Sequence, residues 1–329
     1  MMRWLVTGGA GYIGAHVVRV LRASGREPIV LDDLSTGRAE KVPPGVTLHR
    51  ASVLDTGQLT AIMHAERIDG VVHLAAKKSP GESMTEPWLY YRENVEGMLS
   101  VLAAMRGAGV RRLVYSSSAA VYGNQDRSPI DEDFALNPQS PYGETKVIGE
   151  WLARSAGLVD GVSWASLRYF NVAGAAEPAL GDPGVGNLIP MVFEAIDEGR
   201  APLIFGADYP TPDGTCIRDF VHVADLAEAH VAAAAHVEAQ MGADVLNVGR
   251  GRGASVREVM AMIEQVTGTP LRPEIAPRRP GDIEVSVASV DRITRLLDWR
   301  ASRGLSDMVE SAWSAWQQRS GETTEAPLR

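Results

Sequence analysis

The first half of the chain alternates short apolar runs with longer segments in which apolar residues recur every three or four positions. The short runs are expected to be buried strands, and they lie at 4–6, 28–31, 46–48, 70–76 and 113–115. The longer segments have helical spacing, and they lie at 15–23, 56–66, 87–108 and from 141 onward. Strands that alternate with helices favour right-handed crossovers. The pattern therefore predicts an α/β fold with a doubly wound parallel sheet, whose ligands lie at the carboxyl ends of the strands.

A glycine-rich turn follows the first predicted strand, where the sequence at 6–14 reads VTGGAGYIG. Gly8 would make the tight turn, Gly11 would let a pyrophosphate approach the backbone, and Gly14 would let the next helix pack closely. The amino end of that helix offers unpaired N–H donors to phosphate. The order of strand, glycine turn and helix predicts a Rossmann-like dinucleotide site.

An acidic residue ends the second predicted strand. Asp32 follows Gly14 by about 18 residues, where a carboxylate can bind the adenosine ribose hydroxyls. The same negative charge repels a 2′-phosphate. We therefore expect NAD rather than NADP as the cofactor, despite the nearby Arg38.

Two groups of polar residues follow the strand expected at 113–115. Three serines follow it at 116–118, and the sequence PYGETK at 141–146 opens a helical pattern. On a helix, Lys146 lies over the phenol of Tyr142, so we expect its ammonium group to lower the pKa of the tyrosine. Ser118 could bond the same oxygen, and Tyr142 could then exchange a proton with a sugar or alcohol hydroxyl. The motif alone also fits a surface tyrosine beside a chance lysine, and it favours catalysis only together with a nicotinamide site.

Composition narrows the class of protein further. The 329 residues, 45% of them hydrophobic, suffice for one large or two ordinary domains. A net charge of -9 argues against a nucleic-acid or anionic-membrane partner. The single cysteine, Cys216, excludes an internal disulfide and a thiolate metal cluster. Because no apolar stretch approaches the roughly 18 residues of a membrane span, and the first strand leaves no room for a signal peptide, we expect a cytoplasmic protein without a metal.

Motifs along nearly the whole chain resemble the extended short-chain dehydrogenase/reductase superfamily and, within it, the UDP-glucose 4-epimerase family. The segment DYPTPDG at 208–214, shortly before Arg218, points to this family rather than to the superfamily at large. The matching segments lie at 6–14, 31–34, 78–83, 115–123, 141–146, 167–171, 205–214, 218–222 and 276–279.

The resemblance implies a mechanism without net redox change. Tyr142 would remove the proton of the sugar 4-hydroxyl while the C4 hydride passes to NAD. The 4-keto sugar would then turn over within the site, and the hydride would return to its other face. Ser118 would orient the 4-oxygen, and Lys146 would lower the tyrosine pKa and bond the nicotinamide ribose. The cofactor should stay bound between turnovers.

The resemblance also implies the residues of both ligand sites. The cofactor site would comprise Gly8, Gly11, Tyr12, Ile13, Gly14, Asp32, Asp33, Ser52, Val53, Leu74, Ala75, Ala76, Lys78, Asn94, Ser116, Tyr142, Lys146 and Tyr169. Arg218 and Arg279 can give the diphosphate charge-assisted hydrogen bonds. The substrate site would comprise Lys78, Ser118, Tyr142, Phe170, Asn171, Asn187, Leu188, Phe205, Arg218, Arg279, Asp282 and Ser286.

Domain organisation and assembly follow from the same resemblance. We expect a cofactor domain at 1–172 plus 219–249, a smaller α/β domain for the nucleotide sugar at 173–218 plus 250–320, and a disordered tail at 321–329. The family commonly forms homodimers through the helix that carries Tyr142 and a neighbouring long helix, here 87–108. Ser286 stands where some members have a bulky tyrosine. Its small side chain predicts that UDP-GlcNAc and UDP-GalNAc are also accepted.

Three other functions compete with this interpretation. A nucleotide-sugar 4,6-dehydratase would need an acid just after Ser118, where Ala119 and Ala120 stand. An epimerase for UDP-glucuronate or a UDP-pentose is excluded less firmly. A non-catalytic NAD-binding sensor would have no need of the complete set of Ser118, Tyr142 and Lys146.

Overall fold

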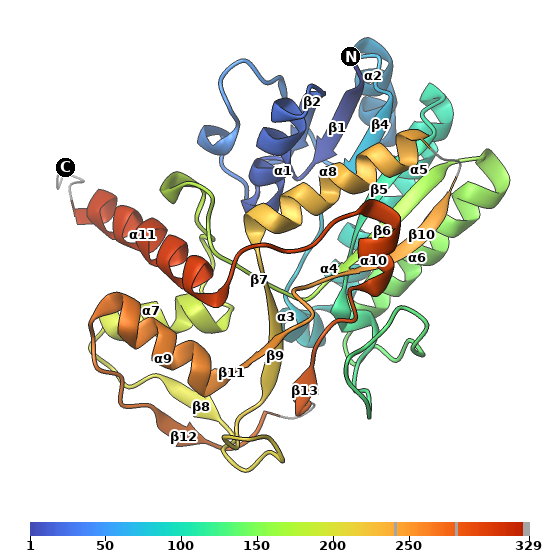
Figure 1. Cartoon of the computed structure of the whole chain (residues 1–329). Helices are drawn as coiled ribbons and strands as arrows, with labels where there is room; N and C mark the ends of the chain where they lie inside the picture. The colour runs from blue at the N-terminus through green and yellow to red at the C-terminus, as the bar shows by residue number, and fades with distance from the viewer. Residues whose placement is uncertain (240–241, 280–281, 325–329) are drawn as a thin grey trace.

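A seven-stranded sheet forms the upper half of the molecule in Figure 1, a computed structural model that describes residues 1–239, 242–279 and 282–324. The order along the sheet is β10-β6-β5-β4-β1-β2-β3, and every neighbouring pair is parallel. The strands are β1 (Arg3–Thr7), β2 (Glu27–Asp32), β3 (Leu48–Arg50), β4 (Gly70–His73), β5 (Arg112–Ser118), β6 (Ser163–Tyr169) and β10 (Ala243–Val248). The order reverses between β1 and β4, so the predicted doubly wound α/β fold is confirmed.

Helices cover both faces of this sheet. On one face α1 (Tyr12–Ala23), α8 (Val223–Ala239) and α10 (Asp291–Leu297) share a buried core with the strands. On the other face α2 (Thr56–Ala65), α5 (Gly97–Ala108) and α6 (Pro141–Asp160) form a second core. Both faces of the strands are therefore apolar, as the continuous apolar runs predict. Among the helices of the described ranges, none is both long and apolar enough to cross a membrane.

The helix predicted at 87–108 is continuous but not uniform. It begins as α4 (Pro87–Tyr90), passes through a π-helical segment, η2 (Tyr91–Glu96), and ends as α5. A π-helical turn inside an α-helix is rare and occurs often at functional sites. Here it carries the buried Asn94.

A smaller unit lies below the main sheet in Figure 1. Strand β9 (Ile217–His222) pairs with β7 (Asn171–Ala173), β11 (Gly253–Ser255) and β13 (Val285–Ser286), while β8 (Leu203–Phe205) pairs with β12 (Glu274–Ala276). Helices α7 (Leu188–Asp197), α9 (Val256–Thr267) and α11 (Leu305–Thr324) complete its core. The short helical segments of the chain are α3 (Pro80–Thr85), η1 (Ala39–Lys41), η3 (Ala119–Val121) and η4 (Pro178–Leu180).

The predicted domain boundaries and the predicted tail can be set against these observed helices and strands. The boundaries at 172 and 218 fall inside β7 and β9, which pair with each other, so the division into two domains stays a prediction. Helix α11 is assigned through Thr324, and the disorder expected from residue 321 stays a prediction. The rest of the predicted tail, 325–329, lies outside the described residues.

Candidate active site

The glycine turn between β1 and α1 admits no side chain at two positions. Gly8 has a φ of 72°, and a Cβ atom there would lie 2.8 Å from the backbone nitrogen of Ala75. A Cβ atom at Gly14 would lie 2.1 Å from the carbonyl oxygen of Gly8. The turn is thus pressed between α1 and the end of β4, at the point where the strand order reverses. This is where a doubly wound fold binds a dinucleotide.

Asp32 ends β2 and faces the glycine turn. Its buried carboxylate accepts hydrogen bonds from the backbone nitrogens of Ala10 at 3.0 Å and Leu34 at 2.9 Å. Burial raises the pKa of Asp32, although both hydrogen bonds oppose that increase. Asp33, by contrast, is exposed and accepts from the backbone and hydroxyl of Ser35. The structure therefore fixes Asp32 beside the turn, where an acid can reach a ribose.

Tyr142 and Ser118 meet at the carboxyl end of β5. The hydroxyl of Ser140 caps α6 by accepting from the backbone nitrogen of Gly143 at 3.2 Å, and Pro141 occupies the first turn. This start places Tyr142, only 7% exposed, in hydrogen-bond contact with the side chain of Ser118. The ring of Tyr90 packs edge-on against Tyr142, with 6.4 Å between the ring centres. The two predicted hydroxyls are thus brought together.

Lys146 lies one helical turn beyond Tyr142. Its Nζ donates a hydrogen bond to the carbonyl oxygen of Ser116 at 2.7 Å and lies 5.8 Å from the centre of the Tyr142 ring. Burial lowers the pKa of Lys146 to about 7, and the negative charge of Glu150 opposes this decrease.

The expected acidification of Tyr142 is wrong for the chain by itself. Its pKa is raised, because burial disfavours the phenolate more than the Ser118 hydrogen bond favours it. Lys146 does little to lower the pKa of Tyr142, since its own pKa near 7 leaves it only partly charged at neutral pH. The sequence could show that the two residues share a helix face, but not how much water the fold excludes.

Several predicted cofactor residues are bonded to other protein groups. The amide of Asn94 holds the backbone of Lys77, accepting from its nitrogen at 2.8 Å and donating to its oxygen at 3.1 Å. The hydroxyls of Ser116 and Tyr169 bond each other. Ser52 accepts from the backbone nitrogen of Leu54 at 3.2 Å. The other predicted residues lie on the same side, with Ile13 in α1, Val53 after β3, and Leu74, Ala75 and Ala76 after β4.

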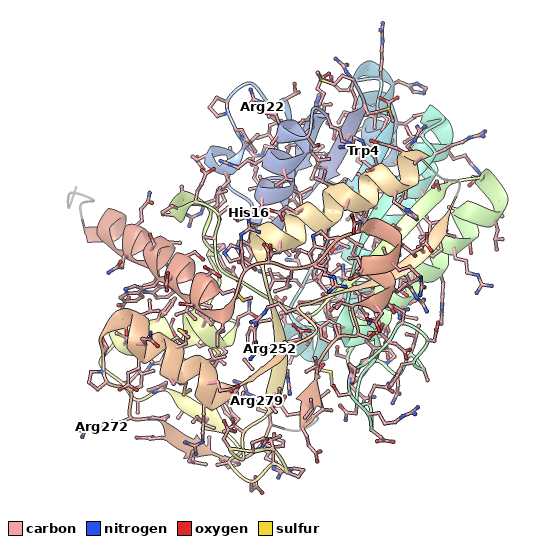
Figure 2. All side chains as sticks on the ribbon, in the orientation of Figure 1. Trp4, His16, Arg22, Arg252, Arg272 and Arg279 are labelled. Carbon is pink, nitrogen blue, oxygen red and sulfur yellow. The ribbon has the colours of Figure 1, made fainter. Side chains whose placement is uncertain are left out.

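A cavity of about 560 Å³ opens below the strand ends, and most of the residues predicted to bind the nucleotide line it. The guanidinium of Arg279 stacks on Phe205, 3.8 Å from its ring centre, and Figure 2 shows Arg279 among the elements of the smaller unit. The Nη2 atom of Arg218 lies 3.2 Å from Asp282. The predicted residues that line the cavity are Tyr12, Asn171, Asn187, Leu188, Phe205, Arg218, Arg279 and Asp282.

Five predicted substrate residues are not among those that line this cavity, and two of them, Ser118 and Tyr142, are the pair at the end of β5 and the start of α6. Ser286 lies in β13, in register with Arg218 of β9. Phe170 is buried in a small core beside Tyr122 and Val147. Lys78 is exposed and reaches the cavity rim through an ion pair with Asp182 at 3.6 Å.

Sequence reasoning missed the contacts that tie the segment after β7 to the cofactor side. The Tyr12 hydroxyl donates to the carbonyl oxygen of Gly174 at 2.5 Å, and Lys41 Nζ donates to that of Gly181 at 2.7 Å. Tyr12 and Lys41 both line the cavity. Since these partners are far apart in the chain and one side of each bond is backbone, no motif could have revealed them.

The fold and this arrangement of residues define a nucleotide-dependent enzyme of the short-chain dehydrogenase type. The chain belongs to the NAD dependent epimerase/dehydratase family, whose model matches residues 4–249. It is 43% identical over 321 residues to a UDP-glucose 4-epimerase of Azospirillum brasilense, covering 96% of this chain and 92% of that one. A UDP-glucose-4-epimerase structure from Stenotrophomonas maltophila, with bound NAD and formylated UDP-arabinopyranose, superposes with a TM-score of 0.94 at 39% identity, covering 98% and 100% of the two chains. The UDP-glucose 4-epimerase of Brucella ovis in complex with NAD gives 0.91 at 37% identity, covering 95% and 97%.

Proposed function

We propose that the protein is an NAD-dependent 4-epimerase that interconverts UDP-glucose and UDP-galactose through a transient 4-keto sugar. The observation that carries the proposal is the contact of Tyr142 with Ser118, one helical turn from Lys146, at the strand ends beside the glycine turn. The similarity to UDP-glucose 4-epimerases over nearly the whole chain supports it.

The residues around the glycine turn fit NAD. Gly8 and Gly14 let the turn pack closely between β4 and α1, the amino end of α1 offers N–H donors to a pyrophosphate, and Asp32 can accept from a ribose. When bound, NAD would supply the hydride acceptor for C4 of the sugar. We assign the nicotinamide side of the site to the residues at the end of β5 and the start of α6.

Tyr142 would move the proton of the sugar 4-hydroxyl, with Ser118 holding the same oxygen. The raised pKa of Tyr142 means that its phenol is protonated in the chain by itself. A positive charge near a phenol lowers the pKa of the phenol. We therefore expect Tyr142 to accept a proton only when the cofactor is in place, which couples deprotonation to hydride removal.

The cavity would hold the nucleotide away from the reacting carbon. Arg218 and Arg279 offer planar donors to the diphosphate, and Phe205 offers a ring face beside them. A sugar held mainly through its diphosphate can rotate between hydride removal and return. Arg218 is paired with Asp282 in this structure, so we expect a diphosphate to compete with that carboxylate.

We also propose that N-acetylated substrates are accepted, because Ser286 is small. Ser286 lies beside Arg218 in the sheet, so a larger side chain there would stand close to one of the proposed phosphate ligands. Assays with UDP-GlcNAc test this extension. Ready turnover of UDP-glucose without any turnover of UDP-GlcNAc would refute it.

A homodimer and a cytoplasmic location complete the proposal. Trp88 of α4 is 81% exposed and Trp151 of α6 is 58% exposed, and Leu99 of α5 and Leu158 of α6 are also exposed. Large exposed apolar groups of this kind indicate an interface. The buried free thiol of Cys216 is compatible with a reducing compartment.

The decisive experiment is to mix the purified protein with UDP-galactose, without added NAD, and to follow UDP-glucose. We expect conversion, because the cofactor should be retained during purification. Parallel assays with UDP-glucuronate and UDP-pentoses identify an epimerase for another nucleotide sugar. Bound NAD without turnover of any of these sugars would instead indicate a sensor.

A further inference from the structure

A buried ion pair lies directly behind the serines of β5. Glu150 of α6 and Arg168 of β6 are 5% and 4% exposed, and they form two hydrogen bonds, from Arg168 Nε at 2.8 Å and from Nη2 at 2.6 Å. The hydroxyl of Ser117 donates a third hydrogen bond to Glu150, at 2.5 Å. The carboxylate thus connects α6, β5 and β6 just beneath the proposed active site.

The position of Ser117 shows what this connection controls. Its neighbour Ser116 gives its carbonyl oxygen to Lys146, and its other neighbour, Ser118, bonds Tyr142. Successive side chains of a strand point to opposite faces, so Glu150 holds β5 from one face while Ser116 and Ser118 project their side chains from the other. A shift of Ser117 would move the partners of both Lys146 and Tyr142.

Arg168 extends the connection away from the site. Its Nη1 donates to the hydroxyl of Tyr122 at 2.9 Å, which in turn donates to Asn247 of β10 at 2.6 Å. Arg168 Nη1 also donates to the carbonyl oxygen of Glu132 at 3.2 Å. Arg168 is therefore fixed on several sides and gives Glu150 a rigid partner.

A buried ion pair is a poor source of stability, because removing two charges from water costs about as much as their attraction returns. Well-packed apolar side chains would serve stability as well at these positions. Unlike apolar residues, the pair places a negative charge, that of Glu150, on the helix face that carries Lys146. Glu150 follows Lys146 by one helical turn.

Charged and titratable groups approach Lys146 from four elements. Tyr142 and Glu150 share its helix, Tyr115 of β5 lies 5.3 Å from its Nζ, and His73 of β4 is close enough for Lys146 to lower the histidine pKa. Tyr169 of β6 lies beyond Tyr142.

The tyrosines are protonated near neutral pH, because burial raises the pKa of each of them. His73 is neutral, since burial lowers its pKa to about 3. Glu150 is thus the anion among these groups.

We infer that Glu150 is a positioning residue for the epimerisation: its negative charge favours the protonated form of Lys146 and, with Arg168, it fixes the end of β5 that Tyr142 and Lys146 contact. The inference rests on the proposed function and adds a role that the Ser118, Tyr142 and Lys146 set does not contain. The sequence carries one trace of it, the spacing of four residues between Lys146 and Glu150.

The test is the pH dependence of kcat for UDP-galactose in the protein as purified with its cofactor. Glu150→Gln keeps an acceptor for Ser117 but removes the charge, so the alkaline limb should move to lower pH by about one unit. Arg168→Gln leaves Glu150 unbalanced and should move that limb to higher pH. Ser117→Ala should lower kcat by about two- to tenfold and leave the limb in place.

Two further variants separate charge from damage to the fold. Glu150→Asp keeps the charge and should keep the alkaline limb, even if kcat falls. Glu238→Gln is the matched control, because Glu238 also accepts from an arginine, Arg26, and from a third donor, Trp4 Nε1, at 2.9 Å. Trp4 lies near the amino end of β1, away from the carboxyl strand ends and in the upper part of Figure 2, and this variant should leave the profile unchanged.

The outcomes distinguish this inference from the proposed function. A parent protein that does not convert any of the UDP-sugars overturns the proposed function, and the inference is then judged by the pKa of Lys146 from NMR titration of parent and variants. If Glu150→Gln and Arg168→Gln both leave the limb or that pKa unmoved, or move it in the same direction, the inference is wrong. Should Glu150→Gln not fold, Glu150→Asp and Arg168→Gln decide the question.

Discussion

The Nζ atom of Lys146 donates to the carbonyl oxygen of Ser116 at 2.7 Å, so the lysine of the proposed site is bound to the strand that carries its serines. The bond fixes the ammonium group in a position where burial lowers its pKa to about 7. Near neutral pH the protein therefore holds this group between its two protonation states. A small change in the surroundings is enough to shift the balance.

Lys146→Met should change how stability depends on pH. The folded-state pKa of Lys146 is near 7 and an unfolded lysine titrates near 10.4. Between these values the unfolded chain binds more protons, so the free energy of unfolding rises with pH. From pH 7 to pH 9 this contribution amounts to about 2 kcal/mol, and Lys146→Met removes it. Denaturant titrations of parent and variant, freed of bound nucleotide, measure the difference. An identical pH dependence in the two proteins would contradict the buried position.

Tyr142→Phe should lower kcat for UDP-galactose by about a hundredfold to ten-thousandfold, because the proton-transferring group is lost. The ring is retained, so its packing against Tyr90 should persist and the thermal midpoint should change little. Binding of UDP, followed by calorimetry, serves as the control for an intact nucleotide cavity. Undiminished turnover would show that another group moves the proton.

Gly14→Ala should remove the bound cofactor and destabilise the fold. The added methyl group would lie 2.1 Å from the carbonyl oxygen of Gly8, so α1 must move away from the turn. Overpacking of this kind costs about 2 kcal/mol. Gly57→Ala in α2 is the control, since its nearest new contact, with Asp55, is an ordinary 3.5 Å. The measurements are NAD content after purification and unfolding by denaturant, and full NAD content in Gly14→Ala would count against a cofactor site at this turn.

Trp151→Glu should convert the proposed dimer to a monomer, because it places a charge in the expected interface between copies of α6. Ile275→Glu on β12 is the matched control, since Ile275 is similarly exposed, at 54%, but belongs to the smaller unit. Light scattering of the parent and both variants gives the masses. A monomeric parent, or a dimer that survives Trp151→Glu alone, would refute this interface.

The sequence predicted strands β1 to β5 of the main sheet because their signals are local. The glycine turn and Asp32 are recognised from short stretches of sequence, although Gly8 and Asp32 contact the distant residues Ala75 and Ala10. The apolar runs identify the buried strands without knowledge of their partners. The spacing of Tyr142 and Lys146 likewise follows from the helix alone. These features needed no long-range information.

The electrostatics of the site could not be predicted in the same way. Whether Lys146 acidifies Tyr142 depends on how far each is removed from water, and the removal comes from Tyr90, Tyr115 and other residues distant in the chain. The pair of Glu150 with Arg168 depends in turn on the register of β5 against β6. The π-helical turn at Asn94 also has no signal in the apolar spacing.

The place of β10 in the sheet has a consequence for synthesis of the chain. Strand β6 pairs with β5 on one side and with β10 on the other, yet some seventy residues of the smaller unit and α8 separate β6 from β10 in the sequence. Until Ala243–Val248 leaves the ribosome, β6 is an unprotected edge that other chains can extend. A growing polypeptide must therefore carry an incomplete sheet for much of translation, and the late arrival of a single strand closes it.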